Sequence, residues 1–215
     1  FGLRSLKLKG MVDDASLLRD RLSYGLYRER MAAPRAVHVR LFFNTEYRGV
    51  YLFEERIDDG MILRRFGGTL GNLFRVRYNG GAVYAWKGAN VAEYVPFPFA
   101  PETNVETGDH GVVVPFVDLL NHDPQAIGSL CDVAKLLDYF AVEAAIINNH
   151  GVAGDPGPDN HYQYHRPESG RFHILPWDLD STWNSDPERD IFRNFQNVRL
   201  SAAVENVPQF RAAYK

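Results

Sequence analysis

Cysteine is nearly absent from this chain of 215 residues, and its one copy, Cys131, has no second cysteine to pair with. This excludes an internal disulfide framework and a cysteine-based zinc site. Long apolar runs are also missing, since none approaches the roughly 20 residues of a membrane-spanning helix. An excess of one charge sign is lacking as well, because the formal net charge is −3. We therefore predict no membrane span in this chain and no nucleic-acid partner.

The composition is that of a soluble globular protein. Hydrophobic residues make up 45% of the chain and charged residues 24%, and the length suffices for one domain with a sizeable core or for two small lobes. The chain opens at Phe1 within what we expect to be a strand, so we interpret it as a fragment of a longer protein. A signal peptide is then not open to sequence inspection.

Antiparallel strands dominate the first 90 residues. Alternating apolar residues and turn-forming residues indicate hairpins, and a cluster of capping residues at 13–16 predicts the start of a helix. We expect the charged face of that helix, which includes Arg19 and Asp20, to be solvated. The expected elements are strands over 3–8, 37–43, 50–55, 70–78 and 82–86, a helix over 17–31, and a short helix within 57–66.

Helices dominate the second part of the chain. Pro96, Pro98 and Pro101 indicate a long loop or a joint between lobes. The expected elements that follow are helices over 112–120, 124–130 and 132–149, a hairpin of strands 161–165 and 171–175, and helical patches from residue 184 on. This order predicts an α+β fold of two lobes, strand-rich over residues 1–90 and mainly helical over 91–215.

An acidic turn follows the last predicted strand. The apolar run 172–175 ends at Pro176, and Asp178 and Asp180 come directly after it. Carboxylates placed at a strand end suit a hard divalent cation. An Asp-rich turn that only caps the next segment would have the same composition.

The loop before the hairpin adds further oxygen ligands. It holds Asp155 and Asn160, five residues apart, after a helix that we expect to be buried. Protein kinases place a catalytic Asp and a metal-binding Asn on one loop, and the main Mg²⁺ ligand on the turn after a hairpin. The chain lacks both the Gly-rich phosphate loop and the Val-Ala-Ile-Lys strand, which excludes an ordinary kinase.

Five segments together resemble the spore coat protein H (CotH) family of atypical, kinase-like proteins. In the family's order they are residues 14–24, 39–55, 71–75, 160–164 and 176–180. The resemblance implies an atypical protein-kinase-like fold, ATP with Mg²⁺ (or Mn²⁺), and phosphotransfer to Ser or Thr of a protein substrate. It also implies a place in the spore coat, at the cell surface or outside the cell.

Site residues carry over from the family position by position. Asp178 resembles the metal-binding Asp of the turn, Asn160 the metal-binding Asn, and Asp180 is near enough to assist. Glu55 stands where the family has a Glu at the end of a hairpin strand, and would face the nucleotide or pair with a cation.

Two positions depart from the family pattern. Arg75 stands where the family commonly has Lys, and we expect it to hold phosphate oxygens, although Arg and Lys are not interchangeable. His150 stands where the family usually has an Asp after the buried helix. The base would then be Asp155, Asp159 or His150 itself.

These departures keep two other functions open. The first is a catalytically weak or inactive nucleotide-binding module of the cell surface, or one for adhesion, on the same fold. The second is a metal hydrolase built on His150, His161 and Asp178. Zinc retained on purification would mark the hydrolase.

Overall fold

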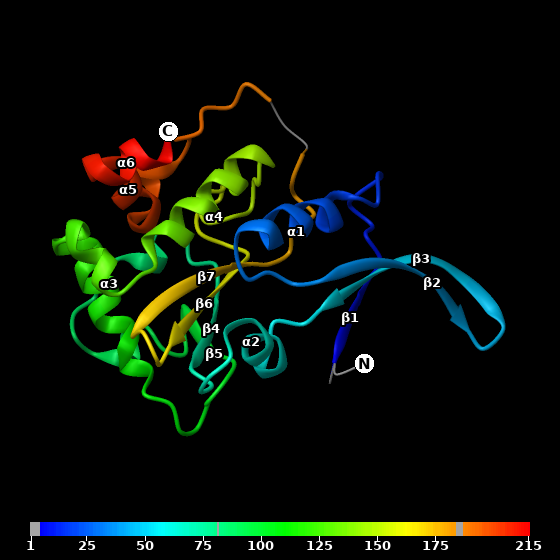
Figure 1. The fold of residues 1–215 in the computed structure, drawn as a ribbon, viewed down its shortest axis with the longest axis horizontal. Coiled ribbons are helices and arrows are strands. Elements are labelled where there is room, and N and C mark those ends of the chain that lie inside the picture. The colour runs from blue at the N-terminus through cyan, green and yellow to red at the C-terminus, as the bar shows by residue number, and fades with distance from the viewer. Residues whose placement is uncertain (1–4, 81, 184–186) are drawn as a thin grey trace.

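Two antiparallel sheets and six α-helices make up the computed structural model, which describes residues 5–80, 82–183 and 187–215 (Figure 1). The first sheet has the order β1–β3–β2, formed by β1 (Leu6–Lys9), β2 (Ala36–Phe43) and β3 (Glu46–Glu55). The second has the order β5–β4–β6–β7, formed by β4 (Asn72–Val76), β5 (Phe99–Pro101), β6 (His161–Arg166) and β7 (Arg171–Pro176). This confirms a mixed class with antiparallel sheets.

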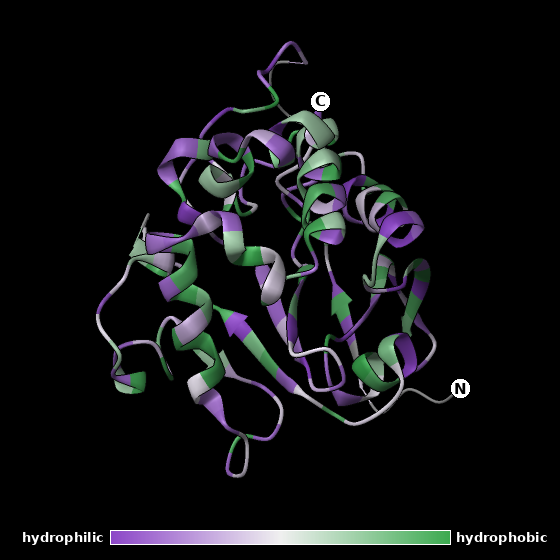
Figure 2. Ribbon diagram, turned by 60° about the vertical axis from the view of Figure 1, so that its left-hand side comes forward, coloured by the Kyte–Doolittle hydropathy of each residue, from purple (hydrophilic) through white to green (hydrophobic). Residues whose placement is uncertain are grey.

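The helices separate and cover these sheets. They are α1 (Arg19–Arg30), α2 (Asp59–Phe66), α3 (Val113–His122), α4 (Val133–Ala145), α5 (Arg199–Asn206) and α6 (Pro208–Tyr214). Hydrophobic and hydrophilic positions alternate along them, as Figure 2 shows, which is the pattern of helices with one buried face. Within the described ranges, no helix combines the length and apolar character needed to cross a bilayer.

The β2–β3 hairpin forms as its alternating residues and its turn predict. Val39 lies opposite Tyr51, and the turn passes through Asn44 at a φ of 55°, a left-handed conformation that Asn tolerates better than most residues. Beyond its pairing with β1, the hairpin extends away from the rest of the chain (Figure 1). The predicted first strand is present from Leu6 on, while residues 3 and 4 lie outside the described ranges.

The second sheet is buried on both faces, since consecutive residues of β4, β6 and β7 are buried. One face packs on the main core, formed with α3, α4 and α5, through residues such as Phe74 and Ile174. The other face packs against α2 through the neighbouring residues Leu73 and Leu175. Successive side chains of a strand point to opposite faces, so each core receives every second residue.

The predicted strand over 82–86 is wrong. Ala82–Tyr84 is a short 3₁₀ helix, and β4 pairs with β5, which lies in the stretch expected as a loop. Gly81, part of the expected hairpin turn, lies outside the described residues. Val83 and Tyr84 are fully buried in the main core, so packing rather than strand pairing places this segment.

The predicted orientation of α1 is wrong in part, although Tyr27 is buried as expected. Its buried residues include Asp20 and Tyr24, whereas Leu22 and Leu26 are exposed. The helix begins two residues later than predicted because Leu17 takes a φ of 59°, and the Asp14 carboxylate accepts a hydrogen bond from the N–H of Arg19 at 2.8 Å. Arg21, Arg28, Glu29 and Arg30 are exposed as expected, whereas Asp20 is buried and lies in a cluster of charges.

Candidate functional site

The two predicted metal ligands Asn160 and Asp178 lie side by side at one end of the β6–β7 hairpin. Asn160 Nδ2 donates to the Asp178 carbonyl at 3.2 Å, and Trp177 N–H donates to the Asn160 carbonyl at 3.1 Å. Both residues have a left-handed backbone, with φ of 44° for Asn160 and 53° for Asp178. Non-glycine residues in this region gather at functional sites, where the surrounding structure holds them in place.

A lysine that the sequence analysis did not single out lies among the carboxylates of this turn. Lys9 Nζ lies 2.5 Å from Asp178 Oδ1, 2.9 Å from Asp180 Oδ2 and 3.0 Å from Asp20 Oδ2. Lys9 ends β1, Asp20 lies in the first turn of α1, and the two other acids follow β7. One cation thus connects three elements that are far apart in the sequence, and we call these four residues the acidic cluster.

Burial and mutual attraction set the protonation of the acidic cluster. Burial lowers the pKa of the Lys9 ammonium, but the three carboxylates outweigh this and raise it above its ordinary value. Burial raises the pKa of Asp20 although Lys9 opposes it. For Asp180, burial also acts to raise the pKa, but the hydrogen bonds from Lys9 and Ser181 together with the nearby positive charge outweigh it and lower the pKa. At neutral pH Lys9 is therefore charged, and charge attraction holds α1 against the acidic turn.

Glu54 extends the negative charge beside this cluster. It is 1% exposed, accepts a hydrogen bond from Tyr24 Oη at 2.9 Å and lies 3.8 Å from Lys7 Nζ. Tyr24 Oη in turn accepts a hydrogen bond from the N–H of Asp178 at 3.1 Å. Lys7 and Lys9 share one face of β1, so both ammonium groups reach the same side of the sheet.

Glu55, the residue selected by the family pattern, points to the opposite face of β3. It accepts hydrogen bonds from the N–H, Nε and Nη2 of Arg35 and also pairs with Arg64. Two roles were expected for Glu55, facing the nucleotide or pairing with a cation, and in the structure it pairs with cations. Its neighbour Glu54 is the acid that lies beside the acidic cluster.

An open cleft of about 580 Å³ adjoins the Asn160–Asp178 pair. The residues that line it are Arg75, Val76, Arg77, Tyr78, Asp159, Asn160, Trp177 and Asp178. The Arg75 guanidinium lies 4.3 Å from the centre of the Trp177 ring, a cation–π contact. Trp177, half-buried, forms a wall of the cleft and holds Arg75 next to the oxygen ligands.

The three candidate bases occupy different surroundings. Asp159 lines the cleft beside Asn160. Asp155 Oδ1 accepts hydrogen bonds from Arg189 and Asn194, at 3.4 and 2.9 Å, and ties the loop to the C-terminal segment. His150 is exposed and follows Asn149, whose N–H donates to the Ser181 carbonyl at 3.0 Å, so it lies near the turn that carries Asp180. The structure thus brings Asp159 and His150 toward the predicted ligands and gives Asp155 a tethering contact.

His161 does not suit the hydrolase hypothesis. Its Nδ1 bonds to the Asp159 carbonyl at 2.8 Å and its Nε2 to Tyr84 Oη at 2.6 Å, so both ring nitrogens are engaged. Burial lowers its pKa to about 4, which keeps the ring neutral. In the part of the chain that the structure describes, no three His, Cys, Asp or Glu side chains are arranged to hold a metal ion.

The chain is similar to known proteins along its whole length. The family model described as CotH kinase protein matches residues 1–215. A curated relative, the inner spore coat protein H of Bacillus subtilis (strain 168), is 25% identical over 236 residues, which cover 100% of this chain and 61% of the relative. Because the family model matches all of it, this chain belongs to the CotH family.

Proposed function

We propose that this protein is an atypical kinase that transfers the γ-phosphoryl group of ATP to Ser or Thr of a protein. The observation that carries the proposal is the acidic cluster, in which Lys9 of a strand pairs with Asp20 of the next helix and with Asp178 after a hairpin. Kinases use this combination of a strand lysine, a helix acid and a metal-binding Asp. The family assignment supports the same activity.

The proposal includes two lobes that meet at the cleft. The first would hold β1 to β3 with α1, and the second the helices α3 to α6. Since β4 pairs with β6, the second lobe would also contain β4. Lys9 and Asp20 would come from the first lobe and Asp178 from the second, so the acidic cluster would lie where the lobes meet.

The oxygen atoms at the turn fit a divalent cation. Asn160 and Asp178 would hold Mg²⁺ or Mn²⁺, and Asp180 would assist, because carboxylate and amide oxygens are the ligands that these hard cations take. When bound, the ion supplies positive charge that neutralises the phosphates.

The residues of the chain would supply positioning and charge. Lys9 and Arg75 would hold phosphate oxygens, and Asp159 would orient the substrate hydroxyl and accept its proton. Asp159 takes this role over Asp155 because it lines the cleft, whereas Asp155 is bonded to Arg189 and Asn194. Such transfers depend mainly on positioning and electrostatic stabilisation.

The test compares the wild-type protein with Asp178→Asn, in which the side chain keeps its shape. We expect ATP with Mg²⁺ to raise the melting temperature of the wild type and radiolabel to pass from γ-labelled ATP to casein. The variant should fold and should lose at least about a hundredfold in transfer rate. Glu106→Gln changes an exposed residue that does not line the cleft and should retain full activity.

Absence of a thermal shift with every nucleotide tried would refute the proposal. Nucleotide binding without transfer would point instead to the inactive surface module. The relative's name places that relative in the inner spore coat, and we propose the same association for this protein.

A further inference from the structure

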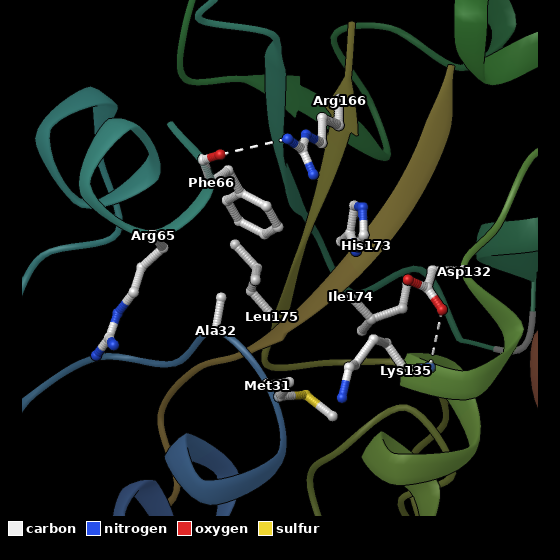
Figure 3. Close-up of a pocket in the computed structure, with 10 residues that line it drawn as sticks. All are labelled: Met31, Ala32, Arg65, Phe66, Asp132, Lys135, Arg166, His173, Ile174 and Leu175. Carbon is white, nitrogen blue, oxygen red and sulfur yellow. Dashed lines mark hydrogen bonds between the residues drawn. The ribbon is translucent and has the colours of Figure 1, made fainter. Parts of the chain in front are cut away.

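A second pocket, of about 300 Å³, lies along β7 and shares no lining residue with the cleft (Figure 3). The residues that line it are Met31, Ala32, Arg65, Phe66, Asp132, Lys135, Arg166, His173, Ile174 and Leu175. Phe66 and Leu175 meet at its centre, and Lys135 reaches in from α4 toward Met31 (Figure 3). This volume and an apolar floor with a few polar groups are typical of ligand sites.

The pocket lies along the outer edge of the second sheet, where Ile174 is 5% exposed. β7 is the last strand of its sheet, and at Phe172 the edge is covered, since Phe172 N–H bonds to the Leu130 carbonyl and Asp132 N–H to the Phe172 carbonyl. Outward-pointing backbone groups recur at every second residue, so those of Ile174 also face outward. Neither the N–H nor the carbonyl of Ile174 has a hydrogen-bond partner within the described ranges. An extended peptide is the ligand that satisfies such an edge.

The rim of the pocket is cationic. Three cationic side chains line it, those of Arg65, Lys135 and Arg166, together with a single carboxylate, that of Asp132. Asp132 Oδ1 accepts a hydrogen bond from the backbone N–H of Lys135 at 3.2 Å. The acids that pair with Lys135 and Arg166 are Asp138 and Glu168, and neither lines the pocket. The lining therefore contains three cationic side chains and one carboxylate, and the Lys135 ammonium also donates to the Arg30 carbonyl.

More cations continue from one side of the pocket. Arg65 is turned away from the pocket centre (Figure 3), its Nη2 donates to the Ala33 carbonyl, and its buried Nε has no partner among the described residues. Burial and the nearby Arg28 and Arg35 lower its pKa, so these arginines are close enough to repel one another. Arg65 therefore belongs to a group of neighbouring cations beside the pocket.

We propose that this pocket binds an extended acidic peptide segment of a partner protein. The peptide backbone would pair with the outward N–H and C=O of Ile174, an apolar side chain would rest on Phe66 and Leu175, and flanking carboxylates or phosphates would meet Lys135 and Arg166. Binding there needs neither nucleotide nor divalent cation, so this proposal stands or falls separately from the kinase activity.

The test measures fluorescence anisotropy of a labelled peptide of alternating glutamate and leucine, without nucleotide. We expect saturable binding to the wild-type chain that added salt weakens. The double variant K135E/R166E should weaken binding at least about tenfold, which corresponds to 1.4 kcal/mol. The matched control R48E/K87E reverses two exposed cations elsewhere and should bind as the wild type does.

Peptide analogues separate the contributions. A glutamine–leucine peptide should bind at least about tenfold more weakly, and so should a glutamate–leucine peptide with an N-methylated backbone, which cannot donate to a sheet edge. Tighter binding with phosphoserine in place of glutamate would support the proposal and identify phosphorylated segments as the partner. Equal binding by K135E/R166E and wild type, or no binding of the acidic peptide, would overturn it. If K135E/R166E does not fold, K135M/R166M serves in its place.

Discussion

The end of β3 separates two charge clusters of opposite composition. On one face, beside Glu54, one lysine is shared by the three carboxylates of the acidic cluster. On the other face, Glu55 is shared by Arg35 and Arg64. Two adjacent glutamates thus lie in opposite electrostatic surroundings, because neighbouring residues of a strand point to opposite faces. The excess of acid suits a divalent cation, and the excess of arginine suits an anion.

Loss of Lys9 should have the largest effect on stability. Lys9→Met leaves Asp20, which is 2% exposed, without its cation, and breaking a buried ion pair costs about 3–5 kcal/mol. Urea unfolding measures this, and the double variant K9M/D20N should recover much of the loss. Lys7→Met is the control, since this partly exposed lysine should contribute less than about 1 kcal/mol. Equal losses for Lys7→Met and Lys9→Met would remove the distinction between the two lysines.

Loss of Glu55 should cost less than loss of Lys9. Glu55→Ala leaves Arg35 and Arg64 unpaired, but their side chains are 43% and 33% exposed and water replaces the carboxylate. We expect about 1–2 kcal/mol in urea unfolding. The control Glu46→Ala removes an exposed partner of Arg48 and should change stability by less than about 0.5 kcal/mol. A cost as large as that of Lys9→Met would mean that the two clusters are equally buried.

Glu143 extends the comparison of the two charge clusters to a buried carboxylate that accepts its hydrogen bonds from backbone N–H groups. It accepts from Val152 at 2.9 Å and from Ala153 at 2.6 Å, and burial raises its pKa from 4.5 to about 7. Between these two values the folded state binds more protons than the unfolded state, so Glu143 makes stability fall as pH rises. His161, whose pKa burial lowers from 6.5 to about 4, has the opposite effect.

Replacing Glu143 should therefore make visible the contribution of His161 to the pH dependence of stability. In Glu143→Gln, stability should rise between pH 5 and 6.5 more steeply than in the wild type, by up to about 1.4 kcal/mol per pH unit. Urea midpoints across this range measure the slope, which is independent of any constant loss from the missing carboxylate. Glu106→Gln should keep the wild-type slope. Parallel curves for Glu143→Gln and the wild type would contradict a raised pKa.

The exposed leucines of α1 should have the smallest effect. Leu22→Ser changes a residue that is 50% exposed, so we expect less than about 0.5 kcal/mol by thermal or urea unfolding. Leu136→Ser, in the core face of α4 and 2% exposed, should cost more than about 2 kcal/mol. A large loss for Leu22→Ser would mean that the leucine face of α1 is buried and that Asp20 faces solvent, which would dissolve the acidic cluster.

Local patterns predicted the parts of the fold that local interactions determine. The hairpins of β2–β3 and β6–β7 follow from alternation and turn residues, and the second of these brings Asn160 next to Asp178. Lys9 could not be found this way, because it is 169 residues from Asp178 and meets it only when the two sheets come together. The inward face of α1 was missed because leucine spacing normally marks the buried side, whereas here the buried partners of Asp20 are charged and polar.

The left-handed backbone at Asn160 and Asp178 restricts what evolution or design can place there. Gly, Asn and Asp adopt this conformation readily, and β-branched residues do not. Gly has no side-chain oxygen, so a site that needs oxygen ligands can have only Asn or Asp at each of these two positions. Exchanging the two residues, as Asn160→Asp with Asp178→Asn, would keep the backbone, the net charge and the count of oxygen atoms. The exchange therefore changes only the position of one negative charge, from residue 178 to residue 160.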